Sequence, residues 1–505
     1  MKKIRPIMFV GTGSDVGKSV INSGFCRIFL QDGYHPAPFK AQNMSLNSYA
    51  TKENLEIGRA QAVQAEACGI ECSVDMNPIL LKPTTNQSSQ VVLNGKPHGN
   101  KSALSYFQDD NRAWLFEEAK KAFDRLKSKY SPVVMEGAGS ISEMNLWEKD
   151  IVNMRMAQYA DAATFLVADI DRGGVFASVY GSIMLLPDEQ RSLIKGVIIN
   201  KFRGDIRLFE SGKKILKDIT GVPVIGVLPY FKDIFIEQED SVVLETMNSR
   251  ASELPSGSIE NPSVNIAVLR LRSLSNFTDF NILARTEGVH LFYTDEPSEL
   301  EQADIVIIPG SKNTINDMFF LKEKGLDKAI VKHHKADKPL YGICGGYQIM
   351  GTMIYDPLHI EGAQETVAGL GILPMETTIE NEKITRQCKF VFTPDGSIGQ
   401  GYEIHAGSTV CAGGIAEGYI PLSVIESAEE GRIEDGCYIS DRCWGSYIHG
   451  IFDNKAVINS VLAQVDANLK AEEDYWTMKE RNYNLLAEHV RKYIDMDYVY
   501  SVLND

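Results

Sequence analysis

Short apolar runs rich in β-branched residues recur along the first half of the chain, and each ends in a glycine or a polar turn. Such runs are typical of strands buried on both faces, and the helical stretches between them indicate a parallel sheet covered by helices. The predicted strands are Ile7–Gly11, Val133–Gly139, Phe165–Asp169, Gly196–Phe202 and Val224–Pro229. We therefore predict an α/β domain for this half of the chain.

The same pattern restarts after a polar stretch, Glu245–Pro262, which is rich in Ser, Asn, Glu and Pro and has no hydrophobic period. That composition is typical of an exposed linker. Further strands are predicted at Asn265–Leu271, Asp304–Gly310 and Pro339–Gly346, and a helical stretch of mixed charge begins near Ala456. The predicted fold class is α/β with two domains, at 1–245 and 263–455, a linker at 246–262 and a helical extension at 456–505.

Composition limits the classes of partner. The 505 residues exceed a single domain of roughly 150 residues, and the formal charge of −16 argues against general nucleic-acid binding, which requires a basic surface. Anionic ligands must therefore be held by local positive features. The N-terminus lacks the apolar core of a signal peptide, and no apolar run approaches the roughly 18 residues of a membrane helix. We expect a cytoplasmic protein without nucleic-acid or membrane partners; its oligomeric state is unknown from the sequence.

The first predicted strand leads directly into a glycine-rich loop, GTGSDVGKS, and a helix-like segment follows. Glycines let backbone amides turn inward around phosphate oxygens, and a helix N-terminus adds partial positive charge. Lys18 supplies a point charge, and Ser19 is placed to ligate Mg²⁺. The loop therefore predicts an ATP site, although five residues rather than four separate Gly11 from Gly17. The predicted nucleotide contacts are Gly11, Thr12, Gly13, Ser14, Asp15, Val16, Gly17, Lys18 and Ser19.

Two acidic residues and one amide at later strand ends fit the same site. Ligands of such sheets bind at the carboxyl ends of strands, where Glu136 and Asp169 stand. Glu136 is a candidate Mg²⁺ ligand, directly or through water, and a carboxylate that caps the following turn is the alternative. Asn200 carries an amide suited to the edge of adenine; a simple turn-forming role is equally open.

Cys344 follows a short apolar strand and precedes two glycines and a predicted helix, in YGICGGYQIMG. A sharp strand-to-helix turn of this kind exposes a nucleophile, and the amides at the helix N-terminus favour a thiolate and form an oxyanion hole. Gly345 and Gly310 are the candidate oxyanion-hole residues. A thiolate also needs a base. His449, in WGSYIHGIFDN, is the first candidate, and His405, in GYEIHAG, competes with it.

A phosphate loop of this longer type joined to a Cys-Gly-Gly elbow resembles the cobyrinate-type glutamine amidotransferases, and the resemblance covers nearly the whole chain. The N-terminal half is also similar to the dethiobiotin synthetase fold. Three segments favour the branch that amidates four carboxylates over the a,c-diamide synthases, which amidate two. They are PFKAQNMSLNSYAT at Pro38–Thr51, EIGRAQAVQAEA at Glu56–Ala67 and MNPILLKP at Met76–Pro83.

The resemblance implies a glutamine-hydrolysing carbon–nitrogen ligase of cobalamin biosynthesis that uses ATP and Mg²⁺. It implies amidation of the b, d, e and g carboxylates of the corrinoid adenosylcobyrinic acid a,c-diamide through acyl phosphates. Cys344 matches the family's nucleophile, and His449 its catalytic histidine. The wider class places Glu or Asp two residues after the histidine, where this chain has Ile451. This branch is known for a dyad, and the sequence does not identify a group that orients His449.

The amide-rich segment KAQNMSLNS, at Lys40–Ser48, directly follows a predicted strand. We predict that Gln42, Asn43 and Asn47 face the nucleotide or the corrinoid; a hydrogen-bonded surface loop is the alternative. Arg172, in DIDRGG, is expected to face the acidic substrate. A different class of function is a phosphate-loop ATPase switch with an inactive amidotransferase-like domain. That class predicts a missing nucleophile or a basic membrane-targeting helix, whereas this chain has Cys344 and no such helix.

Overall fold

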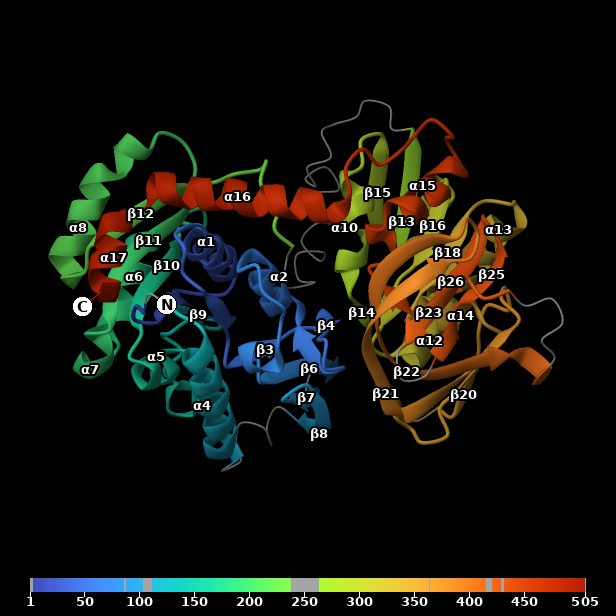
Figure 1. Cartoon of the computed structure of the whole chain (residues 1–505), viewed down its shortest axis with the longest axis horizontal. Coiled ribbons are helices and arrows are strands. Elements are labelled where there is room, and N and C mark those ends of the chain that lie inside the picture. The colour runs from blue at the N-terminus through green and yellow to red at the C-terminus, as the bar shows by residue number, and fades with distance from the viewer. Residues whose placement is uncertain are drawn as a thin grey trace. The chain divides into compact units, whose positions relative to one another are not determined.

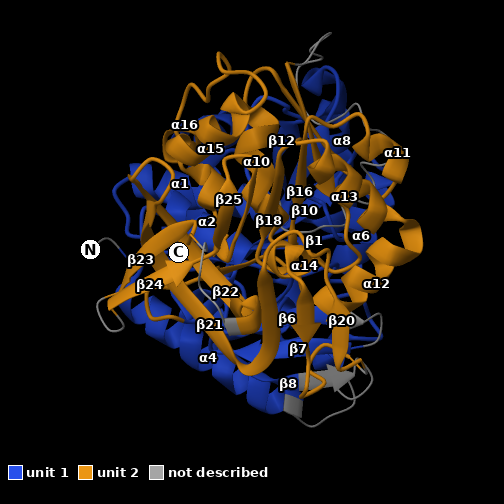
Figure 2. Cartoon of the chain, turned by 90° about the vertical axis from the view of Figure 1, so that its right-hand side faces the viewer, with its two compact units in different colours: residues 1–45, 55–239, 479–505 blue, residues 46–54, 240–478 orange. Residues whose placement is uncertain are grey.

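The computed structural model describes residues 3–85, 88–102, 111–237, 263–362, 364–414, 420–427 and 431–504. The chain divides into two compact units (Figure 2). Unit 1 comprises Met1–Ser45, Leu55–Glu239 and Lys479–Asp505, and unit 2 comprises Leu46–Asn54 and Asp240–Met478. The predicted linker at 246–262 lies outside the described residues.

Unit 1 is built on a six-stranded parallel sheet in the order β12-β11-β10-β1-β9-β2 (Figure 1). These strands are buried along nearly their whole length, because apolar residues occupy successive positions and point to both faces. The sheet confirms the α/β class predicted for the first half. Its strands are β1 (Ile7–Gly11), β2 (Ala37–Phe39), β9 (Val133–Glu136), β10 (Ala163–Asp169), β11 (Ile194–Phe202) and β12 (Val224–Pro229).

Helices cover this sheet, and the C-terminal chain completes the core. Phe25 of α1 packs on Phe9 of β1, with ring centroids 4.7 Å apart. Leu486 and Val490 of α16 belong to the same buried cluster. The helices of unit 1 are α1 (Lys18–Gln31), α2 (Arg59–Ala67), α4 (Asn111–Lys129), α5 (Met154–Ala160), α6 (Val175–Met184), α7 (Asp188–Arg191), α8 (Glu210–Thr220), most of α16 (Tyr475–Tyr493) and α17 (Met496–Asn504).

The C-terminal region is helical but is not the single extension expected at 456–505. Residues up to Met478 group with unit 2, whereas Lys479–Asp505 group with unit 1. The apolar face of α16 and α17 accounts for this division, because it is buried in the core around α1 of unit 1. Among the described residues, none of the helices is both long enough and apolar enough to cross a membrane.

A second, smaller sheet of unit 1 has the order β3-β6-β7-β8. It begins in the amide-rich segment, and β3 runs parallel to β6. Its strands are β3 (Gln42–Met44), β6 (Ile79–Thr85), β7 (Ser88–Leu93) and β8 (Lys96–Ser102); the short strand β5 (Glu56–Gly58) precedes α2.

Unit 2 contains a six-stranded sheet in the order β15-β13-β16-β18-β26-β25, parallel except for the edge pair β25–β26. The strands predicted after the linker are confirmed as β13, β16 and β18. The sheet comprises β13 (Val264–Leu269), β15 (Val289–Thr294), β16 (Ile305–Ile308), β18 (Leu340–Ile343), β25 (Cys437–Ser440) and β26 (Cys443–Ser446). Its helices include α10 (Asn281–Arg285), α11 (Pro297–Leu300), α12 (Thr314–Lys324), α13 (Leu326–Lys335), α14 (Gly345–Met350) and α15 (Lys455–Ala463).

A largely antiparallel sheet in unit 2 had no counterpart in the sequence prediction. Two long strands, β21 and β22, form its centre, and β27 pairs with β22 so that His449 lies opposite Tyr402. The sheet comprises β19 (Met353–Tyr355), β20 (Thr366–Ala368), β21 (Met375–Phe392), β22 (Ser397–Cys411), β23 (Ser423–Ser427), β24 (Gly431–Asp435) and β27 (Ile448–His449). Separately, β14 (Leu274–Ser275) pairs with β17 (Gly310–Ser311).

Candidate active sites

The glycine-rich loop of unit 1 connects β1 to α1, as the sequence predicts. Asp15 and Gly17 have positive φ angles of 56° and 96°, which turn successive amides toward one side of the loop. A Cβ atom at Gly17 would lie 2.2 Å from Asn200 Nδ2, so a side chain does not fit there. Helix α1 begins at Lys18 and directs its N-terminus at the loop. The loop thus has the conformation of an anion-binding turn.

Three polar side chains fix the loop. Lys18 Nζ donates to the carbonyl oxygens of Gly13 and Gly139 at 2.9 and 3.0 Å. Asn200 Nδ2 donates to Val16 O at 2.8 Å, so this amide has a structural role in the loop. Lys201, which the sequence did not single out, donates to Asp15 O at 2.5 Å and to Asp169 Oδ2 at 2.9 Å.

Glu136 is buried behind the loop and accepts four hydrogen bonds or ion pairs. The donors are Ser19 Oγ at 3.4 Å, Lys40 Nζ at 2.9 Å, Gln61 Nε2 at 3.3 Å and Gln64 Nε2 at 3.1 Å. The structure therefore brings the two predicted metal ligands, Ser19 and Glu136, together. Lys40, Gln61 and Gln64 were not predicted, although they lie in the segments that carry the family resemblance.

A Mg²⁺ ion fits this donor set only with additional ligands. Within the described parts of the chain, no group of three or more His, Cys, Asp or Glu side chains forms a metal site. Mg²⁺ usually takes one or two protein ligands and completes its shell with water and substrate phosphates. The oxygens of Ser19 and Glu136, 3.4 Å apart, are compatible with that arrangement, with Glu136 bound directly or through water.

The residues predicted to contact substrate lie in different places. Asn43 is buried in unit 1 and donates through Nδ2 to Gln61 Oε1 at 3.1 Å. Gln42 precedes it in β3, whereas Asn47 is buried in unit 2. Arg172 is exposed beside the phosphate loop, where its guanidinium lies 3.5 Å from Asp15 Oδ2. Gln42, Asn43 and Arg172 thus remain candidates for ligand contacts in unit 1.

In unit 2, Cys344 stands at a sharp turn between β18 and α14. Its φ and ψ angles of 52° and −109° are strained for a non-glycine residue, and its amide donates to Ser446 O at 2.8 Å. A Cβ at Gly346 would lie 1.9 Å from Ile308 O, and one at Gly345 would lie 2.7 Å from Ser311 N. The glycines are required because the elbow packs directly on backbone atoms.

His449 lies at the end of β27 and is held by a carboxylate that the sequence did not identify. Its Nδ1 is 2.7 Å from Asp279 Oδ2, and Asp279 Oδ1 accepts a hydrogen bond from Gly450 N at 3.0 Å. All three groups are buried, and Ile451 is also buried. Burial lowers the pKa of His449, but the charges of Asp279 and the Cys344 thiolate, with their hydrogen bonds, outweigh it and raise the pKa from 6.5 to about 10. The arrangement favours the protonated form of the His449 imidazole.

The candidate oxyanion-hole glycines lie beside this pair. A Cβ at Gly310 would be 3.2 Å from His449 Cε1, and Gly345 directly follows Cys344. The packing of Gly345 on Ser311 brings the elbow against β17, which starts at Gly310. Both predicted glycines are therefore next to the sulfur and the imidazole, where an oxyanion develops in thiol catalysis.

His405, the competing base, faces away from this pair. Side chains alternate along β22, so His405 and Glu403 project from the face opposite Tyr402, whose ring stacks on His449 with centroids 5.4 Å apart. His405 Nδ1 lies 2.8 Å from Gly407 O, and its ring stacks on Tyr447 at 3.7 Å. It lines a separate cavity of about 370 Å³. The geometry thus favours His449 as the partner of Cys344.

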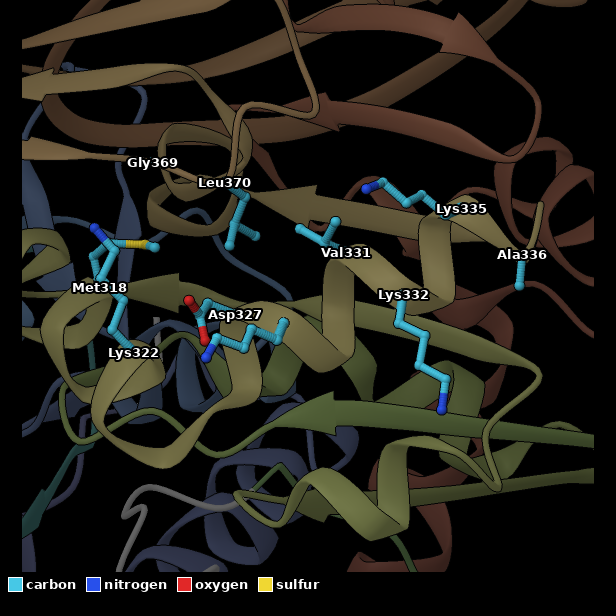
Figure 3. A pocket seen from close by; sticks show the side chains of 10 residues that line it. Met318, Lys322, Asp327, Val331, Lys332, Lys335, Ala336, Gly369 and Leu370 are labelled. Atoms are coloured by element: carbon cyan, nitrogen blue, oxygen red, sulfur yellow. The ribbon is translucent and has the colours of Figure 1, made fainter.

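A cavity of about 620 Å³ lies between α12, α13 and the turn at Gly369 (Figure 3). Two of the lysines that line it make surface contacts: Lys322 donates to Ala368 O at 2.7 Å, and Lys332 pairs with Glu301 at 2.7 Å. Neither Cys344 nor His449 lines it. The candidate glutaminase site is therefore defined by side-chain geometry and not by this cavity.

Comparisons with known proteins agree with the two units. A model described as the CobQ/CobB/MinD/ParA nucleotide binding domain matches residues 7–242. A second, described as the CobB/CobQ-like glutamine amidotransferase domain, matches residues 265–457. Both matches fall where the phosphate loop and the cysteine elbow were found.

Relatives named cobyric acid synthase are similar along the whole chain. The relative from Bacteroides fragilis is 56% identical over 505 residues, with 100% of this chain and 99% of the relative covered. The relative from Phocaeicola vulgatus is 54% identical with the same coverage. The relative from Parabacteroides distasonis is 54% identical, with 99% of each chain covered. Since identity at this level extends over both units, the chain belongs to the cobyric acid synthase family.

Proposed function

We propose that this chain amidates the b, d, e and g carboxylates of adenosylcobyrinic acid a,c-diamide, with glutamine as nitrogen donor and ATP as the activating reagent, to give cobyric acid. The observation that carries the proposal is the Cys344–His449–Asp279 arrangement, in a chain whose other unit holds a phosphate loop. A nitrogen-releasing site and a nucleotide site are the two parts that glutamine-dependent amidation requires.

At the cysteine elbow, the Cys344 thiolate attacks the side-chain carbonyl carbon of glutamine. The amides near Gly310 and Gly345 stabilise the resulting oxyanion. The imidazolium of His449 gives its proton to the leaving nitrogen, so that ammonia departs and a thioester remains. His449 then takes a proton from water, which attacks the thioester and releases glutamate and the thiolate. Asp279 holds the imidazole in the orientation that both transfers use.

In unit 1, a corrinoid carboxylate attacks the γ-phosphorus of ATP, and ADP leaves. Lys18 and the loop amides hold the phosphates during this transfer, because they supply fixed positive potential. Ser19, with Glu136, would hold Mg²⁺, which neutralises phosphate charge in such transfers. Ammonia attacks the acyl phosphate, the amide forms, and inorganic phosphate departs. Gln42, Asn43 and Arg172 are proposed to contact the anionic substrates.

The test is amidation by the full-length chain, followed by mass spectrometry. With glutamine, ATP, Mg²⁺ and adenosylcobyrinic acid a,c-diamide, we expect four successive replacements of hydroxyl by amino groups. Amides formed only on the fully carboxylated acid would instead identify an a,c-diamide synthase. Cys344→Ala should abolish the use of glutamine and spare the use of ammonia. Retained glutamine use would contradict the assignment of Cys344 as the nucleophile.

A further inference from the structure

One carboxylate in the interior of unit 2 lies near the cysteine elbow, and the glutaminase mechanism does not use it. Asp317, in the first turn of α12, is fully buried. Burial raises the pKa of Asp317 to about 6, and the hydrogen bonds that it accepts offset this only in part, so the side chain is ionised at neutral pH. A buried carboxylate needs hydrogen-bond donors around it. The donors of Asp317 therefore identify what it holds in place.

Two short strands supply these donors. Ser311 Oγ, in β17, donates to Asp317 Oδ2 at 2.6 Å. Ser273 N, one residue before β14, lies 3.2 and 3.3 Å from the two carboxylate oxygens. The strands also pair with each other, and beside that pair Lys312 N donates to Ser273 O at 2.8 Å. Asp317 thus bonds to both strands and holds them together.

β17 carries Gly310, one of the candidate oxyanion-hole residues. A Cβ at Gly310 would lie 3.2 Å from His449 Cε1, which places this backbone beside the base. The next residue packs on the elbow, since a Cβ at Gly345 would lie 2.9 Å from Ser311 Cβ. A donor stabilises an oxyanion only when it lies about 2.7–3.1 Å from the oxygen. A shift of β17 would therefore move Gly310 out of range of an oxyanion formed at Cys344.

We propose that Asp317 is a positioning residue for glutamine hydrolysis and holds the backbone of Gly310 where the oxyanion develops. The inference rests on the proposed function. Asp317 acts through Ser311 and Ser273, and not by contact with the reacting atoms. Because the oxyanion exists only in the tetrahedral intermediates and the transition states beside them, loss of the carboxylate lowers kcat and leaves glutamine binding unchanged.

Two variants of the full chain weaken this restraint in different ways. Asp317→Asn keeps the size of the side chain but supplies one accepting oxygen where the carboxylate supplies two. Ser311→Ala removes only the hydrogen bond from the β17 side chain. The matched control is Asp304→Asn. Asp304 also accepts from a backbone amide, Asn265 N at 2.8 Å, but it lies at the opposite end of β16 from Gly310.

Glutamate release is measured against glutamine concentration, which separates kcat from KM. We expect Asp317→Asn to lower kcat about 100-fold, the effect of misplacing an oxyanion donor. Ser311→Ala should lower kcat about tenfold, the effect of one hydrogen bond to a charged group. Formation and hydrolysis of the thioester both pass through an oxyanion, so KM should stay within about twofold of wild type. Asp304→Asn should match wild type, as should amidation with ammonia in every variant.

Alkylation of Cys344 by iodoacetamide, followed by mass spectrometry of its peptide, is the second readout. The reaction needs the thiolate but forms no oxyanion, because sulfur displaces iodide from carbon and leaves the carbonyl intact. We expect the same alkylation rate in wild type, Asp317→Asn and Ser311→Ala. A merely structural role of Asp317 would change this rate, because damage to the elbow alters the thiolate and its access.

Two results would overturn the positioning role. One is a kcat of Asp317→Asn within about threefold of wild type; the other is a fall in kcat accompanied by a changed KM or a changed alkylation rate. If Asp317→Asn fails to fold, as urea unfolding would show, the same criteria applied to Ser311→Ala decide. Cys344→Ala separates the two proposals. Glutamate release that survives Cys344→Ala contradicts the proposed function, whereas its loss in Cys344→Ala with a normal kcat in Asp317→Asn contradicts the positioning role alone.

Discussion

Replacement of Asp279 by Asn tests the assignment of the base most directly. The change preserves the size of the side chain and removes its charge, and an amide group can donate to Nδ1 and stabilise the wrong tautomer of His449. The bond that is lost joins His449 Nδ1 to Asp279 Oδ2 at 2.7 Å, between side chains that are 1% and 2% exposed. It is therefore a buried, charge-assisted hydrogen bond.

The size of the effect follows from that bond. Hydrogen bonds to charged groups contribute about 1.5–3 kcal/mol, and each 1.4 kcal/mol is a factor of ten in rate, so glutamine turnover should fall by about 10- to 150-fold. The pH dependence should change as well. The pKa of His449, raised to about 10, should fall toward its usual 6.5 when the carboxylate is gone. Because the imidazolium is lost as pH rises through this pKa, the alkaline limb of the profile should move to lower pH.

The assay is glutamate release as a function of pH, with ammonia-dependent amidation as the internal reference. Asp295→Asn is the matched control, because Asp295 also pairs with cations, Arg270 and Lys324, in unit 2 and does not contact His449. A variant that keeps at least half of the wild-type turnover and an unchanged alkaline limb would refute the role of Asp279. Equal losses with glutamine and with ammonia would point to unfolding instead.

Three further changes test other parts of the structure. Gly17→Ala should abolish ATP binding and amidation with either nitrogen source, measured by nucleotide titration, because its Cβ would meet Asn200 at 2.2 Å. Gly346→Ala should abolish glutamate release and spare ammonia-dependent amidation, since its Cβ would lie 1.9 Å from a backbone carbonyl. Glu237→Gln should lower the free energy of unfolding in urea by about 3 kcal/mol, because it breaks a buried pair with Arg59 at 2.6 Å. Burial raises the pKa of Glu237 but Arg59 and Lys479 hold it well below 4.5, so this contribution should be present above that pH and vanish in acid.

The two functional motifs could be predicted because each is local in the sequence. The phosphate loop occupies Gly11–Ser19, and the elbow surrounds Cys344, so the residues that define each site are neighbours along the chain. The parallel strands could be predicted for a related reason, since β1 and β12 are nearly continuous apolar runs. Patterns of residues that are neighbours along the chain therefore predicted the fold class, the nucleotide loop and the candidate nucleophile.

The groups that complete each site come from distant parts of the chain. Asp279 precedes His449 by 170 residues and has no apolar or glycine signature of its own. The strand β21 was missed because exposed and half-buried residues interrupt its apolar positions. The hydrogen bond from Ser48 N, in β4 (Ser48–Ala50), to Asn276 Oδ1 spans 228 residues. Such pairings depend on topology, which one sequence does not display.

The cations around the phosphate loop show how an acidic chain holds anionic ligands. Lys40 and Lys201 pair with the carboxylates of Glu136 and Asp169 at 2.9 Å each, so moving either lysine would separate a charge pair. Lys18 instead donates to the carbonyl oxygens of Gly13 and Gly139. A phosphate oxygen carries a full negative charge and a carbonyl oxygen only a partial one, so a phosphate oxygen can replace these carbonyls as the acceptor of the ammonium with a net gain. Lys18 is thus the lysine of this group that is best placed to transfer its bonds to ATP.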